Sequence, residues 1–185
     1  DANDKPLPYN AQSWPQDLDR TAAKAVPERV YFTLAVPRKE ISARKDGKPA
    51  PTVIVGHGYG GSRFDGMQYA GFFATHGLAT LSIDCPSHGI NLDQTTTNLA
   101  KGVLGGFGIK AAAEAVFMDR AFDQNNDGNK DSGADFWSAY LFHTRDMVRQ
   151  SALDYMQLAR LFASFDGTRR WQFDLDGDGQ KELAG

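Results

Sequence analysis

The stretch TVIVGHGYGGSR, residues 52–63, decides the fold class of this chain. Its first five residues, 52–56, are β-branched or apolar without alternation, which is typical of a strand covered on both faces, as in parallel sheets. Residues 64–77 then place apolar side chains at helical spacing and stop at Gly77, and residues 78–84 predict a second buried strand. Strand, helix and strand in this order predict a right-handed βαβ unit and therefore an α/β fold with a parallel sheet.

The remaining segments surround this unit. Residues 1–28 are polar and rich in proline, which indicates an irregular arm over a surface, and residues 29–37 predict one more strand. Residues 85–122 are rich in glycine and weakly periodic, apart from a helix predicted over 109–121, and residues 85–140 as a whole are predicted to form an insertion or lid-like region. The longest predicted helix, 144–163, carries a continuous apolar stripe.

The composition is that of an ordinary globular chain. Its 185 residues suffice for one domain with a sizeable core. With a net charge of −3 and no Lys/Arg run, nucleic acid is a poor fit as a partner, and no apolar run is long enough for a transmembrane segment. A start at Asp1, with no charged-then-apolar leader, predicts a mature chain that is secreted or at the cell surface, in an extracellular or periplasmic setting.

The glycine-rich turn after the first of these buried strands has three interpretations. A phosphate-binding P-loop needs Lys and Ser or Thr after its last glycine, where Ser62 and Arg63 stand instead. The run GHGYGG, residues 56–61, fits the literal dinucleotide fingerprint, with Asp84 as the ribose-binding acid, but the helix begins too late to hold a pyrophosphate. The third interpretation is an oxyanion hole, whose backbone N–H groups stabilise a tetrahedral intermediate.

The segment VIVGHGYGGSR…FATHGLATLSIDCPSHG resembles the third-strand, helix and fourth-strand region of bacterial α/β hydrolases of the esterase and lipase type. The resemblance covers residues 29–90 and extends more loosely over 143–163, which is similar to the helix before the nucleophile strand. It implies an α/β-hydrolase-like, mainly parallel sheet flanked by helices. It also implies that Tyr59 supplies one oxyanion N–H, with Gly60 as the neighbouring candidate, and that His57 packs the turn.

The nucleophile of that family, in G-x-S-x-G, is absent from residues 1–185. No histidine follows His143, and Ser87, His88 and Asp84 are too close in sequence to converge on one scissile carbon. We therefore expect this chain to form the N-terminal part of one hydrolase domain. A second polypeptide or a C-terminal half would complete the fold and carry the catalytic serine, acid and histidine.

Two acidic loops have the oxygen-ligand spacing of calcium loops. DQNNDGNKD, residues 123–131, has glycine at position 6 but Ala134 at position 12, so that Asp135 or water must complete the site. DLDGDGQKE, residues 174–182 within the second loop region 171–185, repeats the spacing. The predicted ligands are Asp123, Asn125, Asp127, Asn129 through its carbonyl, Asp131 and Asp135 in the first loop, and Asp174, Asp176, Asp178, Gln180 through its carbonyl and Glu182 in the second. The predicted Ca²⁺ is structural, since loops so rich in ligands leave no open catalytic position.

Together these features predict part of a secreted, calcium-stabilised serine hydrolase that acts on carboxylic esters as an esterase or lipase. The resemblance implies an ester as the substrate. A lipid is expected because the insertion 85–140 would form a lid that carries Leu104, Phe107, Phe136 and Trp137. Two alternatives remain open: a non-catalytic calcium-binding structural or adhesion module, and a nucleotide-binding α/β domain.

Overall fold

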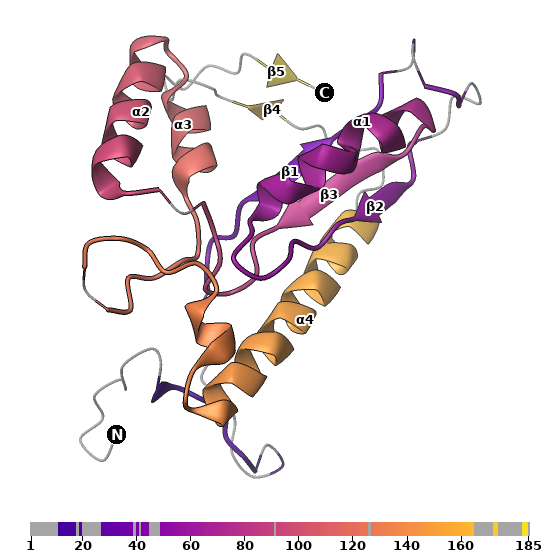
Figure 1. The fold of residues 1–185 in the computed structure, drawn as a ribbon. Helices are drawn as coiled ribbons and strands as arrows, with labels where there is room; N and C mark the ends of the chain where they lie inside the picture. The colour runs from indigo at the N-terminus through magenta and orange to yellow at the C-terminus, as the bar shows by residue number, and fades with distance from the viewer. Residues whose placement is uncertain are drawn as a thin grey trace.

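The computed structural model is shown in Figure 1. It describes residues 11–17, 19, 27–38, 40, 42–44, 49–90, 92–125, 127–164, 172–173 and 183–184. In this part of the chain a small three-stranded sheet has helix α1 across one face and the long helix α4 on the other. A pair of helices, α2 and α3, lies beside them, and irregular segments connect this pair to α4.

The sheet has the strand order β1-β3-β2, with β1 at Phe32–Ala35, β2 at Thr52–Ile54 and β3 at Ala79–Ile83. Strand β2 runs parallel to β3, and helix α1 (Met67–Thr75) connects the two, so the predicted βαβ unit is present. Strand β1 pairs antiparallel with β3. The described sheet is therefore mixed, with an antiparallel edge strand beside a parallel pair, as is common in α/β sheets.

Strand β3 forms the centre of the structure, and all five of its residues are buried. Leu81 and Ile83 pack against Leu158 of α4, with Tyr155 and Phe162 partly buried around them. Ser82, which lies between them in the strand, faces the opposite side of the sheet and packs against Gly66. A Cβ added to Gly66 would lie only 2.1 Å from the Ser82 hydroxyl oxygen. Both faces of β3 are thus covered, as expected for a central strand.

Four helices and two 3₁₀ turns complete the described part of the chain. The 3₁₀ turn η2 (Arg63–Gly66) leads into α1, and η3 (Ala134–Trp137) precedes α4 (Leu141–Ala163), which begins three residues before its predicted start at 144. Helix α3 (Lys110–Phe117) falls within the predicted 109–121. Helix α2 (Gln94–Gly106) has no counterpart in the sequence-based prediction.

Strands β4 (Gln172–Phe173) and β5 (Leu183–Ala184) pair antiparallel on either side of the second acidic loop. Residues 174–182 lie outside the described residues, and so do all five ligands predicted in that loop. Among the helices that the structure describes, none combines the length and the apolar character that a membrane span requires.

Candidate functional site

The carboxyl ends of β2 and β3 lie at the same edge of the sheet, because the two strands are parallel. The glycine turn 56–61 follows β2, and the loop 84–90 follows β3. A third segment, residues 131–137, reaches the same place, as the hydrogen bond from Gly133 N–H to Ser87 O (2.7 Å) shows. Ligands of open α/β sheets bind at this edge, which makes it the candidate site.

The turn exposes backbone donors. Gly61 N–H closes it by donating to Gly58 O at 3.0 Å, and Gly60 has a left-handed backbone with φ +70°. Within the described part of the chain, neither Tyr59 N–H nor Gly60 N–H donates a hydrogen bond. Tyr59 is 64% exposed and Gly60 is also an exposed residue, at the edge where a ligand would bind.

His57 ties the turn to the end of β3. Its Nε2 accepts the Cys85 N–H at 2.9 Å, and its Nδ1 lies 2.9 Å from Gly58 O, which fits a neutral ring with its proton on Nδ1. Burial opposes protonation of His57, yet the side chain of Cys85 and the carbonyl of Gly58 raise its pKa. Burial would raise the pKa of the Cys85 thiol, but the neighbouring His57 lowers it. One ring nitrogen thus contacts Gly58 in the same turn and the other contacts Cys85 after β3, so that His57 joins the turn to the end of β3.

Asp84 and Arg63 form a buried ion pair beneath the turn, and each has a side chain only 2% exposed. The Asp84 carboxylate accepts the Arg63 backbone N–H at 2.6 Å and also binds its guanidinium. The guanidinium donates further to Ala115 O and Val116 O of α3, at 2.6 and 2.9 Å. Asp84 is therefore committed to an internal pair, which argues against its role as a ribose-binding acid.

Ser87, His88 and Asp84 do not assemble into a triad. His88 is buried, and its Nδ1 lies 2.9 Å from Pro86 O. Burial lowers the pKa of His88. Ser87 is buried with φ 62°, and its hydroxyl oxygen has no hydrogen-bond partner in the described structure. In the described structure no hydrogen bond joins these three residues, since Asp84 binds Arg63 and His88 contacts Pro86 O.

Aromatic side chains border the turn on the side of the 131–137 segment. The Tyr59 ring lies 6.0 Å from that of Trp137 and 6.4 Å from that of His88, both edge-on. Phe136 packs on His88 at 4.6 Å. Trp137 is 75% exposed, so Tyr59 and Trp137 form an exposed aromatic pair next to the unpartnered amides. Leu104 and Phe107, the other two lid candidates, belong to α2 and its C-terminal cap.

The first acidic loop folds around its own backbone. The Asp123 carboxylate accepts the N–H groups of Asp127 and Gly128, at 3.2 and 2.9 Å. Asp127 accepts Asn129 N–H at 2.8 Å, a bond that lowers its pKa, and Asn125 accepts Asp127 N–H at 2.8 Å. Asp131 closes the base of the loop by accepting Gln124 N–H at 2.9 Å.

The described residues hold no group of three or more His, Cys, Asp and Glu arranged to bind a metal ion. Asp135, expected to complete the first loop, is fully buried, and its Oδ1 lies 3.1 Å from His143 Nε2 in α4. The structure thus assigns Asp135 to the packing of α4. The oxygen donors that remain in the loop are the hard ligands that Ca²⁺ takes, and carboxylate oxygens keep free lone pairs beside their bonds to N–H.

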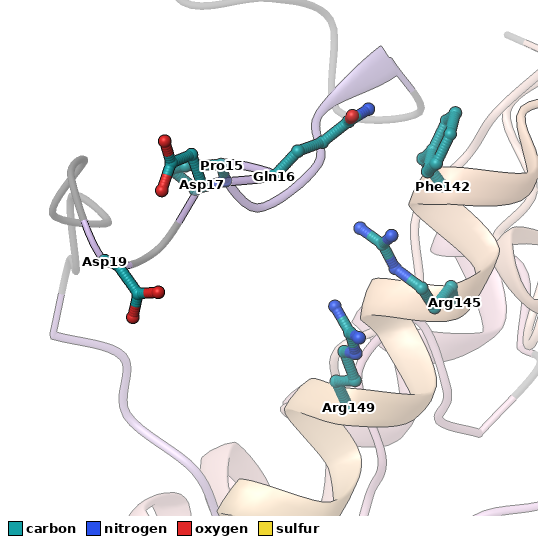
Figure 2. Close-up of a pocket in the computed structure, with 7 residues that line it drawn as sticks. All are labelled: Pro15, Gln16, Asp17, Asp19, Phe142, Arg145 and Arg149. Carbon is teal, nitrogen blue, oxygen red and sulfur yellow. The ribbon is translucent and has the colours of Figure 1, made fainter.

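A separate cavity of about 400 Å³ lies between the arm and the first turns of α4 (Figure 2). The buried Asp146 accepts Trp14 N–H at 2.7 Å and binds both Arg145 and Arg149, which line the cavity. The residues that line the cavity are Pro15, Gln16, Asp17, Asp19, Phe142, Arg145 and Arg149. This cavity shares no residue with the glycine turn.

The buried arginines were not anticipated from the sequence. Arg63 holds Asp84, and Arg120 binds Glu28, Asp154 and the carbonyl of Asp84. One signal was available: Asp84 directly follows a wholly buried strand, so its carboxylate requires a cation nearby.

Comparison of the chain with protein-family models, with curated proteins and with solved structures found no match.

Proposed function

We propose that this chain is the N-terminal part of a serine hydrolase of the esterase or lipase type and supplies the backbone donors of its oxyanion hole. The observation that carries the proposal is that Tyr59 N–H and Gly60 N–H, at the carboxyl end of β2, donate no hydrogen bond within the described residues. In α/β hydrolases one oxyanion donor comes from the loop between a strand and the following helix, which is the place of this turn. Donors held before the reaction stabilise developing charge without reorganisation.

The anchoring of the turn supports this function. His57 fixes the turn to β3 through Cys85 N–H, and Arg63, just after the turn, is held by Asp84. Anchors of this kind keep donors within the narrow distance that a tetrahedral oxyanion requires.

The substrate is a carboxylic ester with an apolar group. The exposed pair of Tyr59 and Trp137 borders the amides and offers an apolar surface to an acyl or alcohol chain. Exposed aromatic side chains beside convergent polar groups are typical of small-molecule sites.

The nucleophile and its partners lie on a segment outside residues 1–185, because the chain contains no G-x-S-x-G. Strand β2 is an edge strand of the described sheet, and its residues Thr52 and Ile54 are exposed. Exposed apolar residues of α4, among them Val148 and Met156, offer further surface to that segment. An unpaired, apolar edge favours pairing with another strand.

Calcium is the proposed structural ion of the first acidic loop and of the second, which lies outside the described residues. The all-oxygen donor set supports this assignment, and the millimolar affinity range of such loops fits a secreted or cell-surface protein. The loop carboxylates would hold the ion, which supplies charge neutralisation to the loop and takes no part in ester cleavage.

The test compares two variants of the complete protein, meaning this chain together with its nucleophile segment, on p-nitrophenyl esters. Tyr59→Pro removes the N–H and is expected to lower kcat about 10²–10³-fold, the usual loss for one oxyanion donor. Tyr59→Phe keeps the N–H and should leave kcat nearly unchanged. Equal, large losses in both variants would assign the role to the phenol and contradict the proposal.

The 185-residue chain alone should hydrolyse no p-nitrophenyl ester. If the chain alone does hydrolyse the ester, and Ser87→Ala abolishes that activity, the nucleophile lies within the chain. An inactive complete protein whose melting temperature still depends on calcium would favour the calcium-binding structural or adhesion module instead.

A further inference from the structure

The 131–137 segment supports the glycine turn from below, although the two are far apart in the sequence. Ser132 Oγ donates a long hydrogen bond (3.5 Å) to Gly61 O, across 71 positions of chain. The same hydroxyl accepts Gly89 N–H at 3.2 Å. One side chain therefore joins the loop after β2 to the loop after β3.

Gly133 makes the closest approach to the turn. Its backbone is left-handed, with φ +82°, and a Cβ built there would lie 3.1 Å from Gly60 N, 3.1 Å from Tyr59 Cδ2 and 2.7 Å from His88 Nε2. Gly60 N is backbone and His88 is a buried ring, so neither gives way as the tip of a flexible side chain would. Only a residue without a side chain permits this contact.

Two other glycines make it possible to distinguish the effect of the contact from the effect of the left-handed backbone conformation. Gly108 has φ +76° and Gly128 has φ +90°, but a Cβ at either would meet nothing within 4 Å. All three positions carry a similar conformational penalty for alanine, whereas only Gly133 touches the turn. Gly108 is therefore a matched control.

We propose that Ser132 and Gly133 are positioning residues that set the orientation of the Tyr59 and Gly60 amides. The inference rests on the proposed function, since it assigns the support of the same oxyanion donors. Gly133 lets the 131–137 segment lie directly against Gly60 N, and the Ser132 hydroxyl holds Gly61 from the other side. A Cβ at 133 pushes Gly60 out of place, and a displacement of about 1 Å at a reacting centre can cost about 10²-fold in rate.

The kinetic experiment uses the complete protein with the variants Gly133→Ala, Gly108→Ala, Ser132→Ala and Ser132→Thr. We expect Gly133→Ala to lower kcat by about 10²-fold with KM within about twofold, because transition-state stabilisation is lost while ground-state binding stays. Gly108→Ala carries the same conformational penalty without the contact and should keep kcat. Ser132→Ala should lower kcat about tenfold, and Ser132→Thr, which retains the hydroxyl, should restore it. Equal kcat values for Gly133→Ala and Gly108→Ala would overturn the proposal.

A second readout does not depend on catalysis. In ¹H–¹⁵N spectra of the 185-residue chain, Gly133→Ala should move the amide resonances of Tyr59 and Gly60, and Gly108→Ala should leave them in place. Should Gly133→Ala fail to fold, Ser132→Ala must move the Gly60 and Gly61 resonances. Unmoved resonances contradict the inference whatever the activity. Moved resonances together with a complete protein that cleaves no ester would refute the proposed function alone and leave the support of the turn established.

Discussion

The glycine turn 56–61 and the acidic loop 123–131 are both short and exposed, yet they are held in opposite ways. Distant segments fix the turn, through His57 to Cys85 and through Ser132 to Gly61, while two of its amides donate to nothing in the described structure. The acidic loop instead bonds its side-chain oxygens to its own backbone, as Asp123 does with Asp127 and Gly128. We therefore propose that the turn offers donors to an anion and the loop offers acceptors to a cation.

This contrast predicts how far the structural effect of a substitution extends. A site held by distant anchors loses its geometry when an anchor is removed, even if the exposed residues are untouched. A loop held by local bonds loses only its own order. The predictions below test this difference, from the largest expected effect to the smallest.

The largest effect is expected when the buried anchor beneath the turn is removed. Arg63→Met leaves the buried Asp84 carboxylate without its guanidinium, which should cost about 3–5 kcal/mol of unfolding free energy. Arg149→Met removes a guanidinium with a side chain 48% exposed and should cost at most about 1 kcal/mol. Urea denaturation of both variants measures the difference. Equal, small costs would mean that the turn does not depend on its anchor.

A smaller effect is expected from calcium. Binding to the folded state alone stabilises it by about 2.7 kcal/mol when the ion stands at 100 times its Kd, so EGTA should lower the melting temperature by several degrees before activity at low temperature changes. Asp127→Ala and Asp176→Ala should each remove part of this shift, and the double variant nearly all of it. Glu114→Gln, an exposed acid outside both loops, is the control.

A melting curve that EGTA leaves unchanged would reduce both loops to ordinary acidic turns. An instant, reversible loss of activity without any change in melting would instead make the metal catalytic. Either result would break the contrast between a donor site for the anion and a separate acceptor loop for the cation.

The smallest effect concerns the thiol at the end of β3. His57 lowers the pKa of Cys85, and thiolate is the form that displaces iodide from iodoacetamide, so alkylation should reach half its maximal rate below the ordinary thiol pKa. His57→Gln removes the imidazole that lowers the pKa of Cys85 and should move this midpoint to higher pH. The exposed His76 provides the control, as His76→Gln should change nothing. Cys85 is the chain's single cysteine, so mass spectrometry reads the reaction without ambiguity.

The sequence predicts the local part of this architecture. The apolar runs at 52–56 and 78–84 with a helix between them lead to the parallel pair β2 and β3, because that pattern has few other solutions. The antiparallel β1 was not anticipated, since a strand's own residues do not record the direction of its neighbour. Helix α2 was missed because glycines 102, 105 and 106 obscure its periodicity, although Asp93, which caps it by accepting Thr96 N–H, was a usable signal.

The candidate site, too, was predictable from the sequence only in part. Tyr59 and Gly60 were predicted as donors from the turn and the resemblance, and whether they act as donors in catalysis stays a prediction. The contact of Gly133 with Gly60 could not be foreseen, because a glycine required for close packing has the same appearance in a sequence as one required for a bend, such as Gly108. Only the three-dimensional arrangement separates the two.

The central claim is that the Tyr59 and Gly60 amides bind the oxyanion. Its most direct test adds a boronic acid to the complete ¹⁵N-labelled protein, since a boronate captured by a serine nucleophile is tetrahedral and carries an anionic oxygen. The account predicts that the amide proton resonances of Tyr59 and Gly60 move downfield as the inhibitor binds, while that of Gly61, already bonded to Gly58 O, moves least. Inhibition by the boronate with both resonances unmoved would contradict it.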